Sequence, residues 1–243
     1  MLKRTYVAGV RVFRPIAARI GLLGALERAG ERRGARWLRS LFAIYDIEDM
    51  AALDLPWWTF AAIEEADKFL KGRPSPRVFE YGSGASTIWL ARRSASVTSI
   101  EHDRPWHAVV SKRLEAHGNA TVKLIEADAE PVSGYLSEKQ GWQGRSFQRY
   151  ATAIDAEPGE FDLIVVDGRA RGACLEHAIK KLAPGGMILF DNSARARYRS
   201  AIAASGLNAR TYRGLTACLP YPDETTLLRP AEVSPRPAPG EQV

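Results

Sequence analysis

The sequence predicts an α/β fold, a doubly wound and mostly parallel sheet of seven strands preceded by N-terminal helices. Three observations predict it. From Val78 onward short apolar runs alternate with helical segments, the first run passes through a glycine turn directly into a helix, and most runs end in an acidic residue. Strands that alternate with helices form parallel sheets, because a parallel connection needs a long crossover that is usually helical.

Composition places the chain among globular proteins. Its 243 residues are 46% hydrophobic and 26% charged, which suits one domain of ordinary size with appendages. No apolar run approaches the length of about 18 residues that a membrane span needs. Cys174 and Cys218 have neither metal-ligand nor redox-pair spacing, and nothing resembles a cleavable secretory signal. A cytoplasmic location is therefore expected.

Residues 1–55 are expected to form a basic helical arm. Residues 1–41 hold ten Lys and Arg against two acids, a balance of +8, whereas the remainder holds 24 against 26, a balance of −2. The chain as a whole therefore has no basic face, and no nucleic-acid partner is expected. Two uses of the arm stay open. It is a pair of packing helices with solvated arginines, or it makes peripheral contact with an anionic membrane or covers the active site.

A helix is expected next, from Asp54 to about Leu70. Asp54 is a plausible N-cap, and Pro56 would lie near the first turn. Trp57 and Trp58, near the start of this helix, either pack in the core or line a ligand cleft.

The main domain is expected to span residues 56–230. Its expected strands are 78–81, 97–101, 121–126, 161–167, 187–190, 208–213 and 223–229. The expected helices between them are 86–93, 105–117, 171–182 and 195–204. Residues 130–160 break the alternation, and an insertion of this length is more often a binding lid than an idle loop. The Pro-rich tail, residues 231–243, is expected to be disordered.

The strongest functional pattern is VFEYGSGASTIWL, residues 78–90. Its apolar strand runs into Gly82 and Gly84, which let the backbone turn sharply and approach a ligand without an obstructing Cβ. A helix begins near Ser86, and the N–H groups of a first helical turn can bind a polar or anionic part of a ligand. A glycine turn alone is weak evidence, because many α/β proteins use one for packing.

An acid at the end of the second strand strengthens the case for a nucleotide cofactor. Glu101 lies 19 residues after Gly82, near the interval of about 20 at which a carboxylate meets a ribose diol. A dinucleotide turn would need a third small residue where this chain has Thr87. An NAD-dependent oxidoreductase is therefore the less favoured alternative.

The pattern Glu80-x-Gly82-x-Gly84 resembles the first motif of the class I S-adenosylmethionine-dependent methyltransferases, whose Rossmann-like fold ends in an antiparallel strand. The resemblance extends, at the level of pattern, over roughly residues 56–230. It implies that Glu101 binds the cofactor ribose, that Asp128 meets the adenine amino group and that His102 packs against the adenine ring. The full set of expected cofactor-binding residues is Glu80, Gly82, Ser83, Gly84, Ser86, Glu101, His102 and Asp128. Without a cofactor, Glu80 would be a solvated acid at a strand end.

Oxygen-bearing side chains also follow the fourth and fifth strands. Asp167, Asp191 and Asn192 offer the ligands that Mg²⁺ or Mn²⁺ takes. The set resembles that of the catechol-type, cation-dependent O-methyltransferases, which implies a divalent metal that holds the acceptor. That family carries a lysine base three residues after the first Asp, where this chain has Ala170. The alternative use of the Asp191–Asn192 pair is a turn and a helix cap.

Asp167, Arg169 and Arg171 are the candidate catalytic residues. Arginine stays protonated in proteins, so both arginines would hold an anionic or polyhydroxylated acceptor and neither would act as a base. We therefore expect an S-adenosylmethionine-dependent methyltransferase that acts on a hydroxyl of a small molecule or saccharide with a divalent metal. The alternatives are a metal-independent enzyme with Asp167 as base, and a non-catalytic or membrane-docking relative. The oligomeric state stays open.

Overall fold

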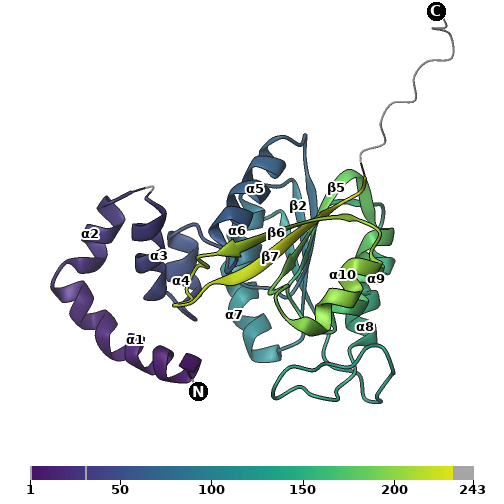
Figure 1. The fold of residues 1–243 in the computed structure, drawn as a ribbon, viewed down its shortest axis with the longest axis horizontal. Coiled ribbons are helices and arrows are strands. Elements are labelled where there is room, and N and C mark those ends of the chain that lie inside the picture. The colour runs from purple at the N-terminus through teal and green to yellow at the C-terminus, as the bar shows by residue number, and fades with distance from the viewer. Residues whose placement is uncertain (1, 31, 232–243) are drawn as a thin grey trace, which may run out of the picture.

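The computed structural model describes residues 2–30 and 32–231, so nearly all of the tail predicted to be disordered lies outside the described residues. A seven-stranded sheet in the order β3-β2-β1-β4-β5-β7-β6 forms its centre (Figure 1). The strands are β1 (Arg77–Tyr81), β2 (Ser96–Glu101), β3 (Ala120–Leu124), β4 (Phe161–Val166), β5 (Leu182–Asp191), β6 (Asn208–Gly214) and β7 (Asp223–Arg229).

The strand directions confirm the predicted fold class. β1 pairs in parallel with both β2 and β4, and β4 pairs in parallel with β5. β7 runs antiparallel between β5 and β6. The sheet is thus mostly parallel, and its last strand in the sequence is antiparallel, as predicted.

Helices cover both faces of the sheet, which is why its central strands are almost continuously apolar. One core contains side chains of α5 (Phe60–Lys71) and α6 (Ala85–Ala91), and α7 (Arg104–Leu114) lies on the same side (Figure 1). The other core contains side chains of α8 (Gln148–Ala151) and α9 (Arg171–Lys180), with α10 (Arg199–Ala204) packed against it. This is the doubly wound arrangement that the alternation predicted.

The order of the strands places a crevice between β1 and β4. From β1 the chain moves outward to β2 and β3, and then returns to β4 on the other side of β1. Ligands of open α/β sheets bind at such a reversal, outside the carboxyl ends of the strands. Here the two strand ends lie very close. A Cβ on Gly82, whose φ is +96°, would lie 3.0 Å from Cα of Gly168, so this position requires glycine.

The predicted start of the helix before the sheet is wrong. α5 begins at Phe60 rather than near Asp54, which is not its N-cap. Asp54 has a positive φ of 52° and its carboxylate accepts hydrogen bonds from Arg92 and Arg93. This acid therefore ties the chain to the end of α6. The helix predicted at 195–204 is likewise split into a 3₁₀ turn, Ala196–Tyr198, and α10.

The segment predicted to be a lid has two parts. Residues 130–146 are mostly loop, whereas α8 and a 3₁₀ turn, Thr152–Ala156, follow it. Phe147, Tyr150 and Ile154 are fully buried and belong to the core beside α9. Aromatic residues in the second half thus pack the sheet, because they lie at helical spacing, and only the first half is free to serve as a cover.

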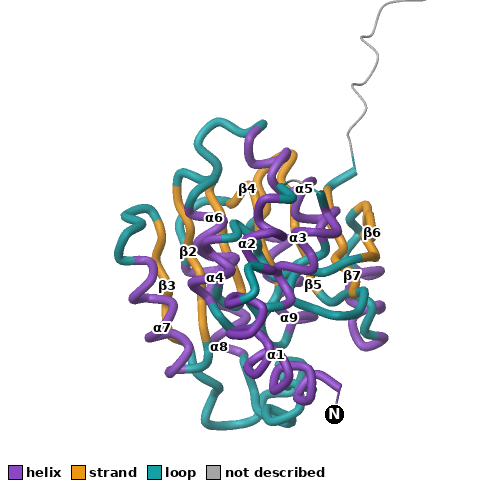
Figure 2. The backbone as a smooth tube through the Cα atoms, turned by 90° about the vertical axis from the view of Figure 1, so that its left-hand side faces the viewer, coloured by secondary structure: helices purple, strands orange, loops and turns teal. Residues whose placement is uncertain are grey.

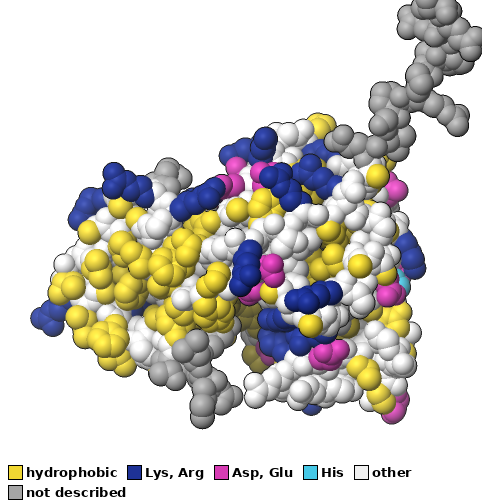
Figure 3. All heavy atoms as spheres, viewed as in Figure 1, with side chains coloured by type: hydrophobic (Ala, Val, Ile, Leu, Met, Phe, Trp, Pro, Cys, Tyr) yellow, Lys and Arg dark blue, Asp and Glu magenta, His cyan; other side chains and the backbone are white. Residues whose placement is uncertain are grey.

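The N-terminal arm consists of α1 (Leu2–Arg19), α2 (Leu22–Arg28), α3 (Arg33–Leu41) and α4 (Ile47–Ala52), and it extends to one side of the sheet domain (Figures 1 and 2). Its base, around Ala43 and Met50, packs against α6 and α7. Its outer part carries large apolar side chains on the surface, a continuous yellow area in Figure 3. In the described residues no helix is both long and apolar enough to cross a membrane.

Candidate active site

A cavity of about 470 Å³ lies at the carboxyl ends of β1, β2, β4 and β5, within the size range of small-molecule sites. Most of the predicted site residues meet there. Its wall includes Gly82, Ser83, Gly84, Ser86, Glu101, His102, Asp167, Arg169, Arg171, Asp191 and Asn192. The topology thus brings together side chains that are up to 110 residues apart in the sequence.

Glu80 and Asp128 are not on this wall. Asp128 instead accepts hydrogen bonds from the backbone N–H groups of Gln148 and Arg149, and so caps the start of α8. Arg149 also forms an ion pair with it, at 3.0 Å. The contact of Asp128 with adenine, implied by the resemblance, stays a prediction. For that contact, Asp128 would have to bind the adenine amino group while it also accepts from the N–H groups that start α8.

Glu80 is fully buried beneath the glycine turn, so it is not the solvated acid of the alternative interpretation. Its carboxylate accepts hydrogen bonds from the hydroxyls of Ser86 and Thr87, in the first turn of α6, and of Ser99 on β2. Thr87 in turn accepts from the N–H of Gly84. Glu80 therefore fixes the glycine turn from below. Burial raises its pKa to about 7, despite the three hydroxyls.

Glu101 lies in the pocket directly beside the glycine turn. One carboxylate oxygen, Oε2, accepts from the backbone N–H and the hydroxyl of Ser83, at 3.2 and 3.1 Å. The other accepts from the N–H groups of His102 and Asp103. Burial acts to raise the pKa of Glu101, but these hydrogen bonds and the neighbouring His102 hold it below its usual value. The acid is therefore ionised and held rigidly.

His102 connects the two sides of the pocket. Its Nδ1 lies 2.7 Å from Glu101, and its Nε2 accepts a hydrogen bond from Nε of Arg169 at 3.0 Å. Trp142, from the loop that precedes α8, meets the imidazole edge to face. The ring is therefore already enclosed by protein, and its predicted stacking on adenine stays a prediction.

Arg171 ties the end of β4 to the end of β5. Its buried guanidinium donates to the carbonyl oxygens of Gly168, Asp167 and Asp191. It also donates to Oδ1 of Asp167, at 2.6 Å. The side chain of Asp167 remains 25% exposed and lines the pocket. Arg171 thereby holds this acid in a fixed position.

The predicted Mg²⁺ or Mn²⁺ site is not supported. Asp167, Asp191 and Asn192 do come together, but the guanidinium of Arg171 lies against Asp167 and repels a second cation. The polar atoms of Asp191 and Asn192 already have partners, because Asn192 donates to Asp191 and Asp223, and Asp191 accepts from Thr225. Among the described residues, no group of three or more His, Cys, Asp or Glu side chains is able to hold a metal ion.

Asn192 is bound to its acidic neighbours by its nitrogen. Its side-chain amide donates to Asp191 and to Asp223, at 2.7 and 3.0 Å, and its φ is +51°. Asp191 also accepts from the hydroxyl of Thr225 on β7. The Asp191–Asn192 pair therefore forms a turn that is fastened to β7. The turn of the alternative interpretation is present, but the helix cap is not, because Arg195 is the N-cap of the 3₁₀ turn that follows.

Several pocket residues were not predicted. Tyr45 and Met50 come from the arm, Lys139 and Trp142 from the 130–146 loop, and Tyr221 from the connection into β7. No local pattern marks them, because each reaches the pocket through the tertiary fold. The two expected uses of the neighbouring tryptophans both occur: Trp57 lines the pocket, and Trp58 is fully buried in the core.

Comparison with known proteins agrees with this geometry. Residues 79–193 match a family model described as a methyltransferase domain. This segment is thus similar to a methyltransferase domain. The matched segment starts in β1 and ends just after β5, so it contains the glycine turn, Glu101 and Asp167. A search of curated proteins returned no match.

Solved structures share the fold. A putative O-methyltransferase from Klebsiella pneumoniae superposes with a TM-score of 0.54 at 20% identity, over 86% of this chain and 96% of the other. The O-methyltransferase TomG from Streptomyces achromogenes, in complex with SAM, gives 0.51 at 19%, over 69% and 80%. A precorrin 8W decarboxylase from Methanobacterium thermoautotrophicum gives 0.51 at 17%, over 72% and 92%.

These likenesses establish the fold of the class I methyltransferases and no specific activity, as the decarboxylase illustrates. The predicted resemblance is thus confirmed at the level of the fold. Nothing in the comparisons supports the finer resemblance to the cation-dependent catechol type.

The raised pKa of Glu80 predicts a measurable pH dependence of stability. The folded protein holds this proton up to about pH 7, whereas the unfolded chain releases it near pH 4.5. The stabilisation is therefore present below pH 4.5 and lost as the pH rises through 7. Relative to Glu80→Gln, wild type should lose about 3 kcal/mol of unfolding free energy over this interval.

Urea unfolding of both proteins between pH 4.5 and 8 measures this difference. Glu126→Gln, a change at an exposed acid that pairs with Arg104, is the control and should follow wild type. A constant difference between wild type and Glu80→Gln would show that Glu80 is ionised throughout.

Proposed function

We propose that this protein is an S-adenosylmethionine-dependent methyltransferase that methylates a hydroxyl of a small molecule or saccharide. One observation carries the proposal. In a segment that matches a methyltransferase domain, the ionised carboxylate of Glu101 lies against the glycine turn and lines a pocket of about 470 Å³, within the size range of small-molecule sites. This is the position from which an acid binds a ribose diol.

The residues around the turn fit the cofactor. The close approach of Gly82 to Gly168 leaves a backbone surface without side chains. Gly84 faces the ring of Trp106, whose Nε1 donates to the carbonyl of Ser83. Glu101 would hold the ribose, and Ser83 and Gly84 would lie beside the methionine part. When bound, S-adenosylmethionine supplies a methyl group already activated by its sulfonium sulfur.

Asp167 is the residue that would accept the proton of the acceptor hydroxyl. It is the pocket acid at the end of β4, partly exposed and held by Arg171. Asp191 is a weaker candidate, because burial favours its protonated form. The unfavourable surroundings for a metal support the metal-independent alternative, in which a positioned carboxylate deprotonates the hydroxyl as it attacks the methyl carbon.

The first prediction of the proposed function concerns cofactor binding. Glu101→Gln should weaken the binding of S-adenosylhomocysteine about 30-fold, because a hydrogen bond to a charged group contributes about 2 kcal/mol. Isothermal titration calorimetry measures the affinity, and a thermal melt checks the fold. Glu126→Gln is the matched control. Equal affinities in a folded Glu101→Gln protein would remove Glu101 from the cofactor site.

The second prediction concerns the chemistry. Asp167→Asn should lower kcat by at least about 100-fold, the range expected for loss of a general base, and leave S-adenosylhomocysteine affinity nearly unchanged. Wild-type turnover should persist in EDTA. Asp155→Asn, outside the pocket, is the control. Activity that is lost in EDTA and restored by Mg²⁺ would instead reinstate the predicted metal.

We also propose that the arm rests on an anionic membrane surface. Val12, Phe13, Ile16, Ile20, Leu22 and Leu38, here called the apolar arm face, are between 40% and 71% exposed. Single exposed apolar residues are ordinary, but a contiguous patch of this kind is typical of an interaction surface. Figure 3 shows the patch across the arm.

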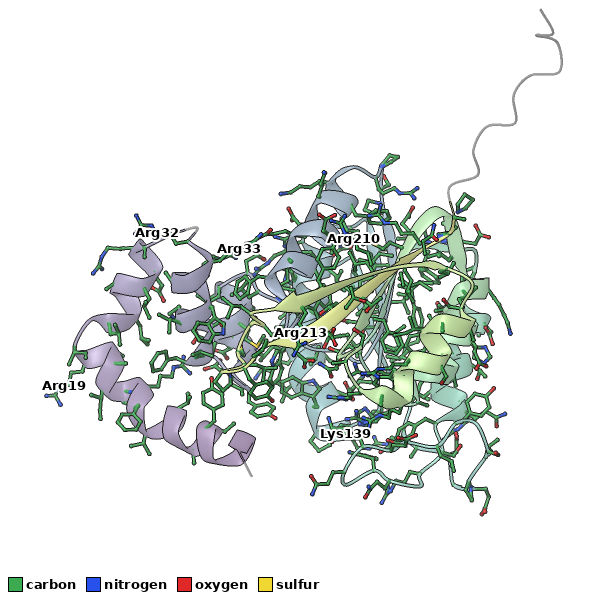
Figure 4. The ribbon with its side chains drawn as sticks, viewed as in Figure 1. Arg19, Arg32, Arg33, Lys139, Arg210 and Arg213 are labelled. Atoms are coloured by element: carbon green, nitrogen blue, oxygen red, sulfur yellow. The ribbon has the colours of Figure 1, made fainter. Side chains whose placement is uncertain are left out.

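The charge around this face favours a membrane over a second copy of the chain. α1 contains no acidic residue, and Arg19, Arg28 and Arg32 are exposed beside the patch. Figure 4 shows Arg19 and Arg32 pointing away from the body of the protein. Two copies meeting through this face would bring like charges together, whereas anionic lipid headgroups would complement them.

Sedimentation with vesicles tests the membrane proposal. Wild type should bind vesicles of phosphatidylglycerol and phosphatidylcholine, and not vesicles of phosphatidylcholine alone. The double variant Phe13→Gln/Ile20→Gln should bind at least about 10-fold more weakly, because two apolar side chains no longer enter the lipid. Val109→Gln, at an exposed position on α7, is the control. A stable dimer in light scattering that the double variant dissociates, without vesicle binding, would assign the face to a second copy.

A further inference from the structure

A second, smaller cavity of about 140 Å³ adjoins the main pocket, and no residue of the glycine turn lines it. It lies between the 130–146 loop, the first turn of α9 and residues 195–198. Lys139, Gly168, Arg169, Arg171 and Arg195 line both cavities. Its volume is below the range of about 300–1,000 Å³ of whole-ligand sites. It therefore suits a substituent of a ligand that is bound in the main pocket.

The wall of this side cavity is strongly basic. Five cationic side chains, those of Lys139, Arg169, Arg171, Arg195 and Arg197, face a single acid, Glu138. Glu138 lies 3.8 Å from Arg197 and is largely exposed, so it offsets little of the charge. In the part of the chain that the structure describes, no carboxylate forms an ion pair with Arg195, which is half-buried.

Two further observations show that the positive charge acts on its surroundings. Burial would raise the pKa of the Tyr198 phenol, but Arg171, Arg197 and Arg195 hold it below its usual value. Burial lowers the pKa of Arg169, and the neighbouring Arg171 lowers it further. Tyr198 and Arg169 thus both lie in the field of neighbouring arginines. Burial also lowers the pKa of Arg171, but the charges of Asp167, Tyr198 and Asp191 outweigh it and raise that pKa.

The charge of Arg171 is partly offset by its ion pair with Asp167, whereas among the described residues no carboxylate forms an ion pair with Arg169. Arg171 donates hydrogen bonds mainly to backbone carbonyl oxygens, which carry no net charge, and one to the carboxylate of Asp167. Arg169 donates to His102 and to the carbonyl of Gly168. Gly172 and Ala173, in the first turn of the ten-residue helix α9, also line the cavity. The N–H groups of a first turn have no acceptors within the helix, and they add to the positive potential.

We propose that the side cavity binds an anionic group, a carboxylate or a phosphate, of the methyl acceptor, and that Arg195 is its principal ligand. This inference rests on the proposed methyltransferase function and names its substrate class. Arg171 contacts both Asp167 and the cavity, so an acceptor anchored there presents its hydroxyl near the Asp167 carboxylate. Fixed arginines would thus orient the acceptor, the task that a chelated metal performs in the cation-dependent enzymes.

A matched panel of acceptors tests the proposal. S-Adenosylhomocysteine release is measured for 3,4-dihydroxybenzoate against catechol, and for glucose 6-phosphate against glucose. Calorimetry of the same compounds with the protein saturated in S-adenosylhomocysteine reports binding without turnover. We expect one anionic member to be bound or methylated about 10- to 100-fold better than its neutral partner, the range for a hydrogen bond between charged groups. The pair that shows it distinguishes carboxylate from phosphate.

The variant Arg195→Gln should abolish this preference and leave affinity for S-adenosylhomocysteine unchanged. Arg199→Gln, an exposed arginine of α10 that lines neither cavity, is the control and should behave as wild type. A preference that survives Arg195→Gln, or equal use of the anionic and neutral members, would overturn the subsite and leave the methyltransferase function intact.

Two other results would also be decisive, the first against the side cavity and the second against the proposed function. Loss of S-adenosylhomocysteine affinity in Arg195→Gln would assign the arginine to the cofactor. Absence of any S-adenosylhomocysteine binding by wild type would overturn the proposed function itself. In that case, calorimetry of the anionic and neutral compounds with the protein alone still tests the side cavity, because binding is measured without methyl transfer.

Discussion

The active-site geometry depends on one buried guanidinium. Arg171 joins the carboxyl ends of β4 and β5 by donating to backbone oxygens of both strand ends and to the carboxylate of Asp167. Breaking a buried pair of this kind leaves an uncompensated charge, so the arrangement is rigid. It fixes the position of Asp167 and supplies a permanent positive charge where the sequence predicted a divalent ion. Asp191, left without a cation of its own, favours the neutral form.

The pocket wall carries charges of both signs. Glu101 lies beside the glycine turn and accepts from Ser83, whereas Arg169, Arg171 and Arg195 also line the side cavity, to which no residue of the turn contributes. The carboxylate of Glu101 would complement a positively charged sulfonium cofactor, and the arginines would complement an anionic acceptor. His102 contacts both Glu101 and Arg169.

The fold was predictable because short segments of the sequence determine its strands, helices and turns. Buried β-branched and aromatic runs predicted the strands, and the glycine turn and the acid 19 residues later predicted that the carboxyl ends of β1 and β2 contribute to one site. Errors arose where a long-range contact decided the structure. Asp54 resembles a helix cap, but its pairing with Arg92 and Arg93 draws it away from the start of α5. The second half of the 130–160 insertion packs in the core, because its aromatic residues find space beside α9.

The sequence by itself therefore determined the order of the elements, the glycine turn, the position of Glu101 and the convergence of Asp167, Asp191 and Asn192, since strand-end residues of a parallel sheet must meet. Only the tertiary structure decided what surrounds them. It placed Arg171 against Asp167, buried Glu80 beneath the turn, turned the nitrogen of Asn192 toward two acids and brought Lys139, Arg195 and Trp57 to the pocket. The physical reason is that the charge, burial and hydrogen bonding of a side chain depend on neighbours distant in sequence, and these interactions have no local pattern.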